Sequence, residues 1–401
     1  MKWIGMGLAA VAVVCIVGAL IWLFGGASRP APTGPFAVGT RLFTVEDPQR
    51  LETWGAHIGE PRQVAVRVWY PATPGDEPLL TSMDGRVSAA FGELYGFPIP
   101  GSDGPPSASR IDAAPLGEAH PVVLFSHGGF SDAGQNASLM EELASHGYVA
   151  VSIGHTHESV MTLFPADRAV PIEPELGGAI AELQDASAET IGTYRRALDA
   201  LTSASSHAEA RAAALGLGEA YREMWSPLPV SIDDLVETRV GDLERVAEVL
   251  RGWNADPENP LYGQLDLDRL AIAGHSLGAY AVVHAAAQQR VSAQAIVALD
   301  IPYFLLDGSH RYRVDQPLLS LYAESTRLGH GERAHTAGAN RFLAASQRER
   351  TLAGTSHMNL SDMNFLPRVV RFTGLLGPVD GAEATEVVRA EVLSFLEDEL
   401  D

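Results

Sequence analysis

The sequence has almost no cysteine and few basic side chains. Its 401 residues include a single cysteine, Cys15. This residue lies in an apolar run near the N-terminus, so the rest of the chain can form no disulfide and has no thiol nucleophile. Acidic residues outnumber basic residues by 50 to 28, which gives a net charge of -22. Nucleic-acid binding depends on clustered Lys and Arg, and this charge balance argues against it.

An uninterrupted apolar run from Trp3 to Phe24 sets the N-terminus apart. As a helix it would extend about 33 Å, enough to cross a bilayer, whereas a cleaved signal peptide has an apolar core of about 7 to 15 residues. We therefore expect a transmembrane anchor over residues 1–25 and a linker over 26–40. The alternative is a signal peptide cut after Ala27, which would give a secreted protein. Both interpretations export the remaining domain to a periplasmic or extracellular location.

Residues 41–401 read as one domain in which short apolar strands alternate with helices. This alternation is typical of a mostly parallel central sheet with helices on both faces, the α/β class. The expected strands are 121–125, 148–153, 269–273, 293–299, 317–322 and 348–353, and the expected helices are 138–145, 242–251, 280–288 and 384–400.

Three further stretches complete the predicted organisation. Residues 41–45 and 63–69 predict an antiparallel opening pair of strands. Residues 91–115 are dense in Pro, Gly and Ser and predict a long loop near a substrate entrance. Residues of about 158–235 predict a helical insertion on the carboxyl side of the sheet, where such folds bind ligands. We expect this insertion to cap the site, and the alternative is a surface helix pair without a role in binding.

The segment Gly274-His275-Ser276-Leu277-Gly278 places a serine between a predicted strand and a predicted helix. The pattern G-x-S-x-G at such a junction is a nucleophile elbow, typical of the α/β-hydrolase fold. The glycines let strand and helix pass closely, while the tight turn holds the serine hydroxyl out. The pattern alone arises by chance in glycine-rich chains, and a capped turn is the alternative. Its placement at a strand-to-helix junction makes Ser276 the candidate nucleophile.

The base that activates the serine is expected downstream, because in this fold the order along the chain is serine, acid, histidine. His357 follows the last predicted strand, where a loop can bring an imidazole over Ser276. The other downstream histidines fit less well, since one lies two turns along the helix after the elbow and the rest lie in polar stretches: His284, His310, His330 and His335.

The acid and the oxyanion donors come from strand ends. Asp300 and Glu324 each follow a buried apolar strand, and the residue pattern leaves both open as the acid. An oxyanion hole needs backbone amides, one from the residue after the serine and one from a glycine-containing loop after an earlier strand. We expect Leu277 to supply the first amide and Gly129 the second.

A pair of histidines after a predicted strand raises the alternative of a metal site. His155-Thr156-His157-Glu158 follows a predicted strand, and H-x-H with a nearby carboxylate can ligate zinc. No downstream cluster completes the ligand set, so we expect no metal and no cofactor, with His155 lining the serine site. A metal-dependent hydrolase that uses His155 and His157 remains the alternative.

With these residues placed, the chain resembles the platelet-activating factor acetylhydrolase family and dienelactone hydrolase-like serine esterases, within the α/β-hydrolase superfamily. In that family the acid follows the strand after the elbow helix, and the resemblance therefore selects Asp300. The chain departs from the family at Leu277-Gly278-Ala279, where an aromatic residue and two glycines are common. The resembling segments are 66–72, 121–129, 143–148, 268–278, 296–300 and 354–362.

The resemblance implies a serine ester hydrolase that cleaves short-acyl or lipid-like carboxylic esters with Ser276, His357 and Asp300. A hydrolase-fold binding protein without activity is the alternative from another class. The expected partners are an ester substrate and, through residues 1–25, a membrane.

Overall fold

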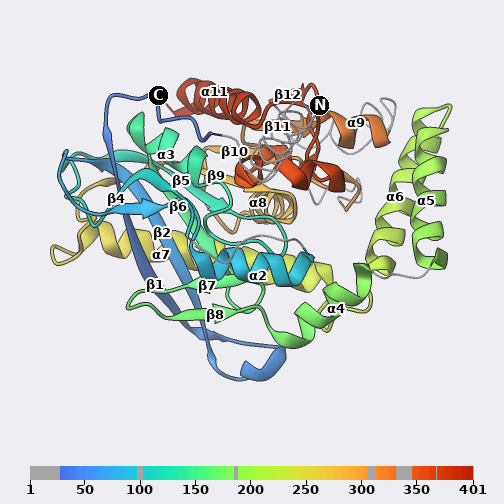
Figure 1. The fold of residues 1–401 in the computed structure, drawn as a ribbon, viewed down its shortest axis with the longest axis horizontal. Coiled ribbons are helices and arrows are strands. Elements are labelled where there is room, and N and C mark those ends of the chain that lie inside the picture. The colour runs from blue at the N-terminus through green and yellow to red at the C-terminus, as the bar shows by residue number, and fades with distance from the viewer. Residues whose placement is uncertain are drawn as a thin grey trace, which may run out of the picture.

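The computed structural model describes residues 28–96, 103–184, 188–305, 313–330, 346–366 and 368–400. Within these residues, ten strands form one sheet in the order β12-β11-β10-β9-β5-β6-β2-β1-β4-β3. All neighbours from β12 to β6 are parallel, and β6, β2 and β1 then pair antiparallel. The predicted mostly parallel α/β sheet is confirmed (Figure 1).

Six strands pair in parallel along one part of the sheet, and four further strands extend it. The parallel strands are β5 (His120–Ser126), β6 (Val149–Gly154), β9 (Leu265–His275), β10 (Ala295–Leu299), β11 (Leu318–Ala323) and β12 (Gln347–Leu352). The others are β1 (Ala37–Leu51), β2 (Pro61–Ala72), β3 (Leu79–Thr81) and β4 (Pro106–Ile111).

Helices cover both faces of the sheet, each over its own apolar core. On one face α7 (Ile232–Ala255) and α8 (Leu277–Ala287) pack in the larger cluster of buried side chains. On the other face α3 (Ala137–Ser145) and α11 (Gly381–Leu400) pack in the second cluster. The α8 segment is apolar around its whole circumference, as expected for a helix with almost all its residues buried.

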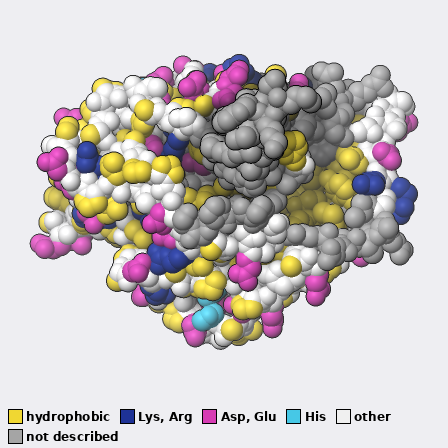
Figure 2. Space-filling model, viewed as in Figure 1, with side chains coloured by type: hydrophobic (Ala, Val, Ile, Leu, Met, Phe, Trp, Pro, Cys, Tyr) yellow, Lys and Arg dark blue, Asp and Glu magenta, His cyan; other side chains and the backbone are white. Residues whose placement is uncertain are grey.

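The inserted segment carries two short strands and three helices. These are β7 (Met161–Leu163), β8 (Ala169–Pro171), α4 (Pro174–Gln184), α5 (Ala188–Thr202) and α6 (His207–Met224). The α5–α6 pair stands at one end of the molecule, away from the sheet (Figure 1). Figure 2 shows a hollow beside this pair in which hydrophobic side chains gather. The remaining elements are α2 (Gly85–Tyr95), α9 (Glu324–His330) and the 3-10 helices η1 (Gly55–His57), η2 (Tyr303–Leu305), η5 (His357–Leu360), η6 (Asp362–Phe365) and η7 (Arg368–Thr373).

The region of residues 91–115 differs from the long loop predicted for it. Helix α2 runs through its first residues, because Asp84 caps the helix by accepting from the Arg86 amide and Gly96 ends it with a φ of 67°. Phe91 is buried on this helix. Further on, β4 pairs parallel with β1. The many Pro and Gly residues are typical of loops, and for this reason the sequence pattern did not predict these short elements.

The N-terminal part of the sheet begins earlier than expected. Strand β1 starts at Ala37, so the last residues of the predicted linker belong to the sheet, and its antiparallel pairing with β2 is confirmed. The predicted anchor over residues 1–25 lies outside the described residues. Within the part of the chain that the structure describes, no helix has the length and apolar character needed to cross a membrane.

Two glycines determine how closely the elbow packs. A Cβ atom on Gly274 would lie 2.4 Å from the backbone of Gly278, and one on Gly278 would lie 2.0 Å from the Ser126 carbonyl oxygen. Real Cβ atoms do not approach backbone this closely, so no larger residue fits at either position without moving β9, α8 or the end of β5.

Replacing Gly278 by Ala should destabilise the protein by about 3 kcal/mol, because the new methyl group overlaps backbone that cannot move away. The change is measured as a shift of the urea unfolding midpoint at constant slope. Gly252→Ala on α7 is the matched control, since an added Cβ there meets nothing within 4 Å. The control should be neutral or up to about 1 kcal/mol more stable. Equal stabilities of the two variants would contradict the close approach.

Candidate active site

Ser276 occupies the turn between β9 and α8 in a strained backbone conformation. Its φ is 52° and its ψ is -119°, values that are rare for a residue with a side chain. The Ser276 amide donates to the Leu299 carbonyl at 2.9 Å, which ties the turn to the end of the neighbouring strand β10. Such strain persists only where the surroundings hold it, and this is the geometry expected of a nucleophile elbow.

Asp300 and His357 are joined by a short hydrogen bond. The Nδ1 atom of His357 lies 2.6 Å from Oδ2 of Asp300, and the carboxylate also accepts from the Ala323 amide at 2.9 Å and the Thr326 hydroxyl at 2.7 Å. Burial by itself raises the pKa of Asp300, but these hydrogen bonds, led by that from His357, outweigh it and hold the pKa below its usual value. Asp300 therefore stays ionised and can orient the imidazole.

Glu324, the other predicted acid, has a structural role instead. Its Oε2 atom accepts from the Gly354 amide at 2.9 Å, so it holds the turn before the histidine loop. Of the alternative bases, His284 faces Gln288 at 2.7 Å on the helix surface. His310 and His335 lie outside the described residues.

His275, the residue before the serine, supports the histidine loop from below. Burial, followed by the proximity of His357, lowers the pKa of His275 to about 3, so the ring is neutral. Its Nε2 lies 3.2 Å from the His357 carbonyl oxygen and its Nδ1 lies 3.2 Å from Nε2 of Gln135. A neutral ring donates through one nitrogen and accepts through the other, which fits both partners. Gln135 also accepts from the Gly128 amide at 2.6 Å.

Ser276 and His357 line one cavity of about 330 Å³. Gly129 and Leu277 line it too, and a Cβ on Gly129 would lie 3.5 Å from the Leu277 side chain. As the first residue of α8, Leu277 has an amide that the helix leaves without an acceptor. The structure therefore brings together all five residues predicted for the site. The rest of the wall is largely apolar and includes Phe91, Tyr95, Phe130, Ile180, Tyr221, Trp225, Met358 and Met363.

The inserted segment supplies part of this wall. Ile180 comes from α4, Tyr221 from α6, and Trp225 follows the end of α6. The Trp225 ring lies 5.6 Å from the Phe130 ring, centroid to centroid, which brings the insertion against the loop that carries Gly129. The insertion thus forms part of the cavity wall at the carboxyl end of the sheet.

Arg239 on α7 holds the loop that carries Gly129. Its fully buried guanidinium donates to the carbonyl oxygens of His127 and, at 3.2 Å, of Gly128, and it pairs with the buried carboxylate of Glu158. The Gly128 carbonyl also accepts from Nδ1 of His127 at 2.7 Å. The peptide unit is planar and trans, so a carbonyl of Gly128 held toward Arg239 turns the N–H of Gly129 in the opposite direction.

A second serine, histidine and aspartate lie in line behind this loop. Nε2 of His155 is 2.9 Å from the Ser126 hydroxyl, and Nδ1 is 2.9 Å from Oδ2 of Asp242. All three side chains have no exposed surface. The contacts run from serine to histidine to aspartate, as in a catalytic triad. Because the three side chains are fully buried, no substrate can reach them, and their role is structural.

The expectation that His155 lines the serine site is therefore wrong, and so is the alternative of a metal hydrolase that uses both His155 and His157. Both ring nitrogens of His155 are engaged in the interior. His157 belongs to a different cluster, with His57 and Glu173.

Sequence reasoning did not identify Arg239 or Asp242, although a signal was present. On α7 they continue the helical spacing of Leu235 and Val246, which are buried. Two charged residues within the apolar stripe of a helix must find buried partners, since an unpaired buried charge is strongly unfavourable. Their partners come from β1, β2, the loop after β5 and the segment after β6, which the spacing alone cannot indicate.

A family model and two curated relatives all indicate similarity to platelet-activating factor acetylhydrolases. The profile of "Platelet-activating factor acetylhydrolase, isoform II" matches residues 244–401. The chain is 25% identical to platelet-activating factor acetylhydrolase of Gallus gallus over 393 residues, covering 94% of this chain and 85% of the relative. It is 24% identical to that of Cavia porcellus, with coverage of 94% and 79%.

A solved structure shows the same fold. A ferulic acid esterase from Streptomyces cinnamoneus superposes with a TM-score of 0.67 at 22% identity, over 94% of each chain. With its elbow, its sheet and these relatives, the chain is similar to the platelet-activating factor acetylhydrolase family of α/β hydrolases and is a carboxylic ester hydrolase.

Proposed function

We propose that the chain hydrolyses carboxylic esters through an acyl-enzyme on Ser276, with His357 as the base and Asp300 as its orienting acid. The observation that carries this proposal is the 2.6 Å hydrogen bond between Asp300 and His357, at the edge of the cavity that Ser276 also lines. A serine hydroxyl becomes a competent nucleophile only when a base takes its proton, and an acid behind the base stabilises the imidazolium that forms.

In this mechanism Ser276 attacks the ester carbonyl while its proton passes to Nε2 of His357. The amides of Gly129 and Leu277 donate to the oxyanion of the tetrahedral intermediate. His357 then protonates the departing alkoxide, which leaves as the alcohol. Water attacks the acyl-enzyme with His357 again as base, and the acid is released as Ser276 regains its proton.

Arg239 acts in this mechanism as a positioning residue. It touches no substrate, since it lies behind the loop. Its hydrogen bonds to the carbonyl oxygens of His127 and Gly128 fix the direction of the Gly129 amide. An oxyanion donor is effective because it is already aimed before charge develops. A loop free to rotate about this peptide would lose that advantage without losing the substrate-binding cavity.

The substrate proposed from the cavity is an ester with a short or lipid-like acyl group. Aromatic and aliphatic side chains form most of the wall, and the cavity volume of about 330 Å³ is near the lower end for ligand sites. The relatives named above act on platelet-activating factor by their names, which supports a lipid-like ester. Export of the domain and anchoring through residues 1–25 stay predictions, since that segment lies outside the described residues.

Ser276→Ala should abolish turnover of p-nitrophenyl butyrate, and Asp300→Asn should lower kcat by about 10⁴-fold, because the imidazole loses its orienting charge. Glu324→Gln is the matched control at the other strand end and should retain near wild-type kcat. Labelling by a fluorophosphonate probe should be lost in Ser276→Ala. Undiminished turnover in a folded Ser276→Ala protein would overturn the proposal, and an unlabelled wild-type protein would favour an inactive binding protein.

Arg239→Lys should lower kcat by about 10- to 100-fold with little change in KM, because a lysine keeps the charge beside Glu158 but cannot grip two carbonyls at once. Arg245→Lys on the same helix, at a partly exposed position, is the control. Circular dichroism and thermal unfolding verify that the variant is folded. A rise in KM at unchanged kcat would show that the loop shapes the binding cavity and does not aim the oxyanion donor.

A panel of p-nitrophenyl esters from acetate to decanoate tests the substrate proposal. Wild-type kcat/KM should peak at a short acyl chain and then fall. Trp225→Ala opens the wall of the cavity and should raise kcat/KM for octanoate relative to butyrate by about tenfold. Tyr262→Ala, at an exposed residue remote from the cavity lining, is the control. An unchanged profile in Trp225→Ala would place the acyl chain elsewhere.

A further inference from the structure

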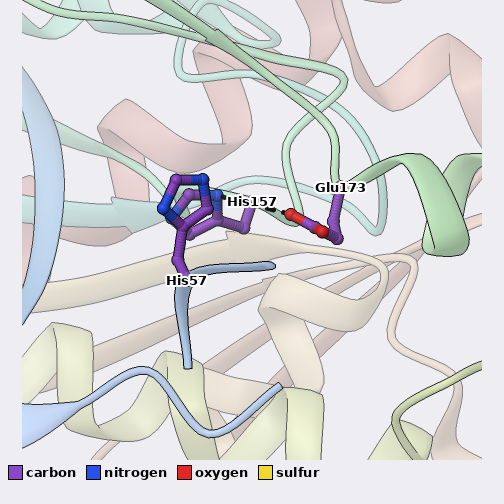
Figure 3. A group of neighbouring side chains, drawn as sticks. All are labelled: His57, His157 and Glu173. Atoms are coloured by element: carbon purple, nitrogen blue, oxygen red, sulfur yellow. Dashed lines mark ion pairs between the residues drawn. The ribbon is translucent and has the colours of Figure 1, made fainter. Parts of the chain in front are cut away.

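Three potential metal ligands from distant parts of the chain converge outside the catalytic cavity. They are His57 in η1, His157 after β6, and Glu173 between β8 and α4. One ligand atom from each lies within 4.8 Å of the other two. Figure 3 shows the two imidazole rings face to face with the Glu173 carboxylate directed toward His157. None of the three is among the described residues that line the catalytic cavity.

Backbone contacts hold the three segments against one another. The Glu173 amide donates to the His157 carbonyl at 2.8 Å, and the Glu173 carboxylate accepts from the Ala56 amide at 2.8 Å. The His57 and His157 rings are stacked with centroids 4.3 Å apart. His157 has a φ of 70°, which is uncommon for a residue with a side chain and marks a position fixed by its surroundings.

A carboxylate stands behind each imidazole. Oε2 of Glu60 lies 3.1 Å from Nδ1 of His57, and Oε1 of Glu52 lies 3.8 Å from Nε2 of His157. Metal-binding histidines usually donate their second N–H to a carboxylate, which fixes the tautomer and raises the basicity of the ligand nitrogen. The 3.1 Å contact of His57 is of this kind and leaves its Nε2 as the ligand atom. At 3.8 Å Glu52 is too far for a hydrogen bond and places only a negative charge beside His157, whose Nδ1 is the nitrogen near Glu173.

The distances and charges suit a divalent cation. Nδ1 of His157 lies 4.0 Å from Oε2 of Glu173, and ligand atoms around tetrahedral zinc are separated by roughly 3.3 Å. Small side-chain rotations close this gap. The carboxylates of Glu60, Glu52 and Glu173 lie 3.1 to 4.0 Å from the nitrogens of the two imidazole rings, and the nearby Arg62 is paired with Glu52 and with Asp242.

We propose that His57, His157 and Glu173 bind zinc, with water as the fourth ligand. Two imidazoles and one carboxylate are a ligand set that zinc accepts readily. The ion would pin η1 and the start of the insertion to the end of β6. Through Glu52 and Arg62 the site adjoins the buried network of Asp242 and His155, which lies behind the oxyanion loop.

Metal analysis of the full chain, stripped with EDTA and titrated with ZnCl2, tests this proposal. One equivalent of zinc should remain after gel filtration and raise Tm by a few degrees, since a ligand that binds only the folded state stabilises it. Cobalt(II) should give the visible absorption of a tetrahedral site. Failure of the wild-type chain to retain either ion overturns the proposal.

His157→Gln and Glu173→Gln should each lose the zinc-dependent rise in Tm and the cobalt absorption. His146→Gln is the control, because this surface imidazole pairs with Glu142 elsewhere in the fold. Tm in EDTA, compared with metal-free wild type, shows whether each variant is folded. His57→Gln, at a partly exposed position, gives a variant with little effect on the interior. One equivalent of zinc retained in the folded ligand variants would place the ion elsewhere and refute the assignment.

Discussion

The carboxylate of Asp242 is the interaction on which the interior of this protein depends. It is fully buried, and it binds Arg62 from β2, Arg50 from β1 and His155 from the segment after β6. Burial opposes its ionisation, yet the charge of Arg62 and the hydrogen bond from His155 hold its pKa well below the usual range. Removing Arg62 would leave the buried carboxylates of Asp242 and Glu52 short of positive charge. The carboxylate thereby fixes α7 against three other elements at once.

The fixed position of α7 determines the geometry of the candidate site. Arg239 lies one turn before Asp242 on the same helix, and its guanidinium reaches the loop after β5. The buried charges thus fix the oxyanion loop through Arg239. The elbow is held by apolar packing, because α8 lies in the larger cluster of buried side chains. Specificity is built differently. Beside the loop after β5, the cavity wall comes from α2, the insertion and the segment after β12, all outside the parallel strands.

How much of this could be predicted from the sequence depends on the range of the interactions involved. The parallel strands, the elbow at Ser276 and the loop of His357 are local patterns, read from apolar runs and glycine spacing. Residue pattern left Asp300 and Glu324 open, because both end a buried strand, and only the resemblance to a family distinguished them. Helix α2 was missed because a cap and a terminal glycine in a Pro- and Gly-rich stretch look like a loop. Arg239 was missed because its partners are more than 80 residues away along the chain.

The backbone at the reacting residues carries a consequence for protein engineering. Ser276 and Asp300 both have positive φ, 52° and 47°, a conformation that disfavours side chains by about 1–2 kcal/mol at each position. Glycine would relieve that strain at Ser276, so a search for stability alone would favour a substitution that deletes the proposed nucleophile. At Asp300 the same change would also remove the hydrogen bonds from His357, the Ala323 amide and the Thr326 hydroxyl, which opposes any gain. Stability and chemistry are therefore opposed at Ser276, and thermostable variants of this protein must gain their stability elsewhere in the fold.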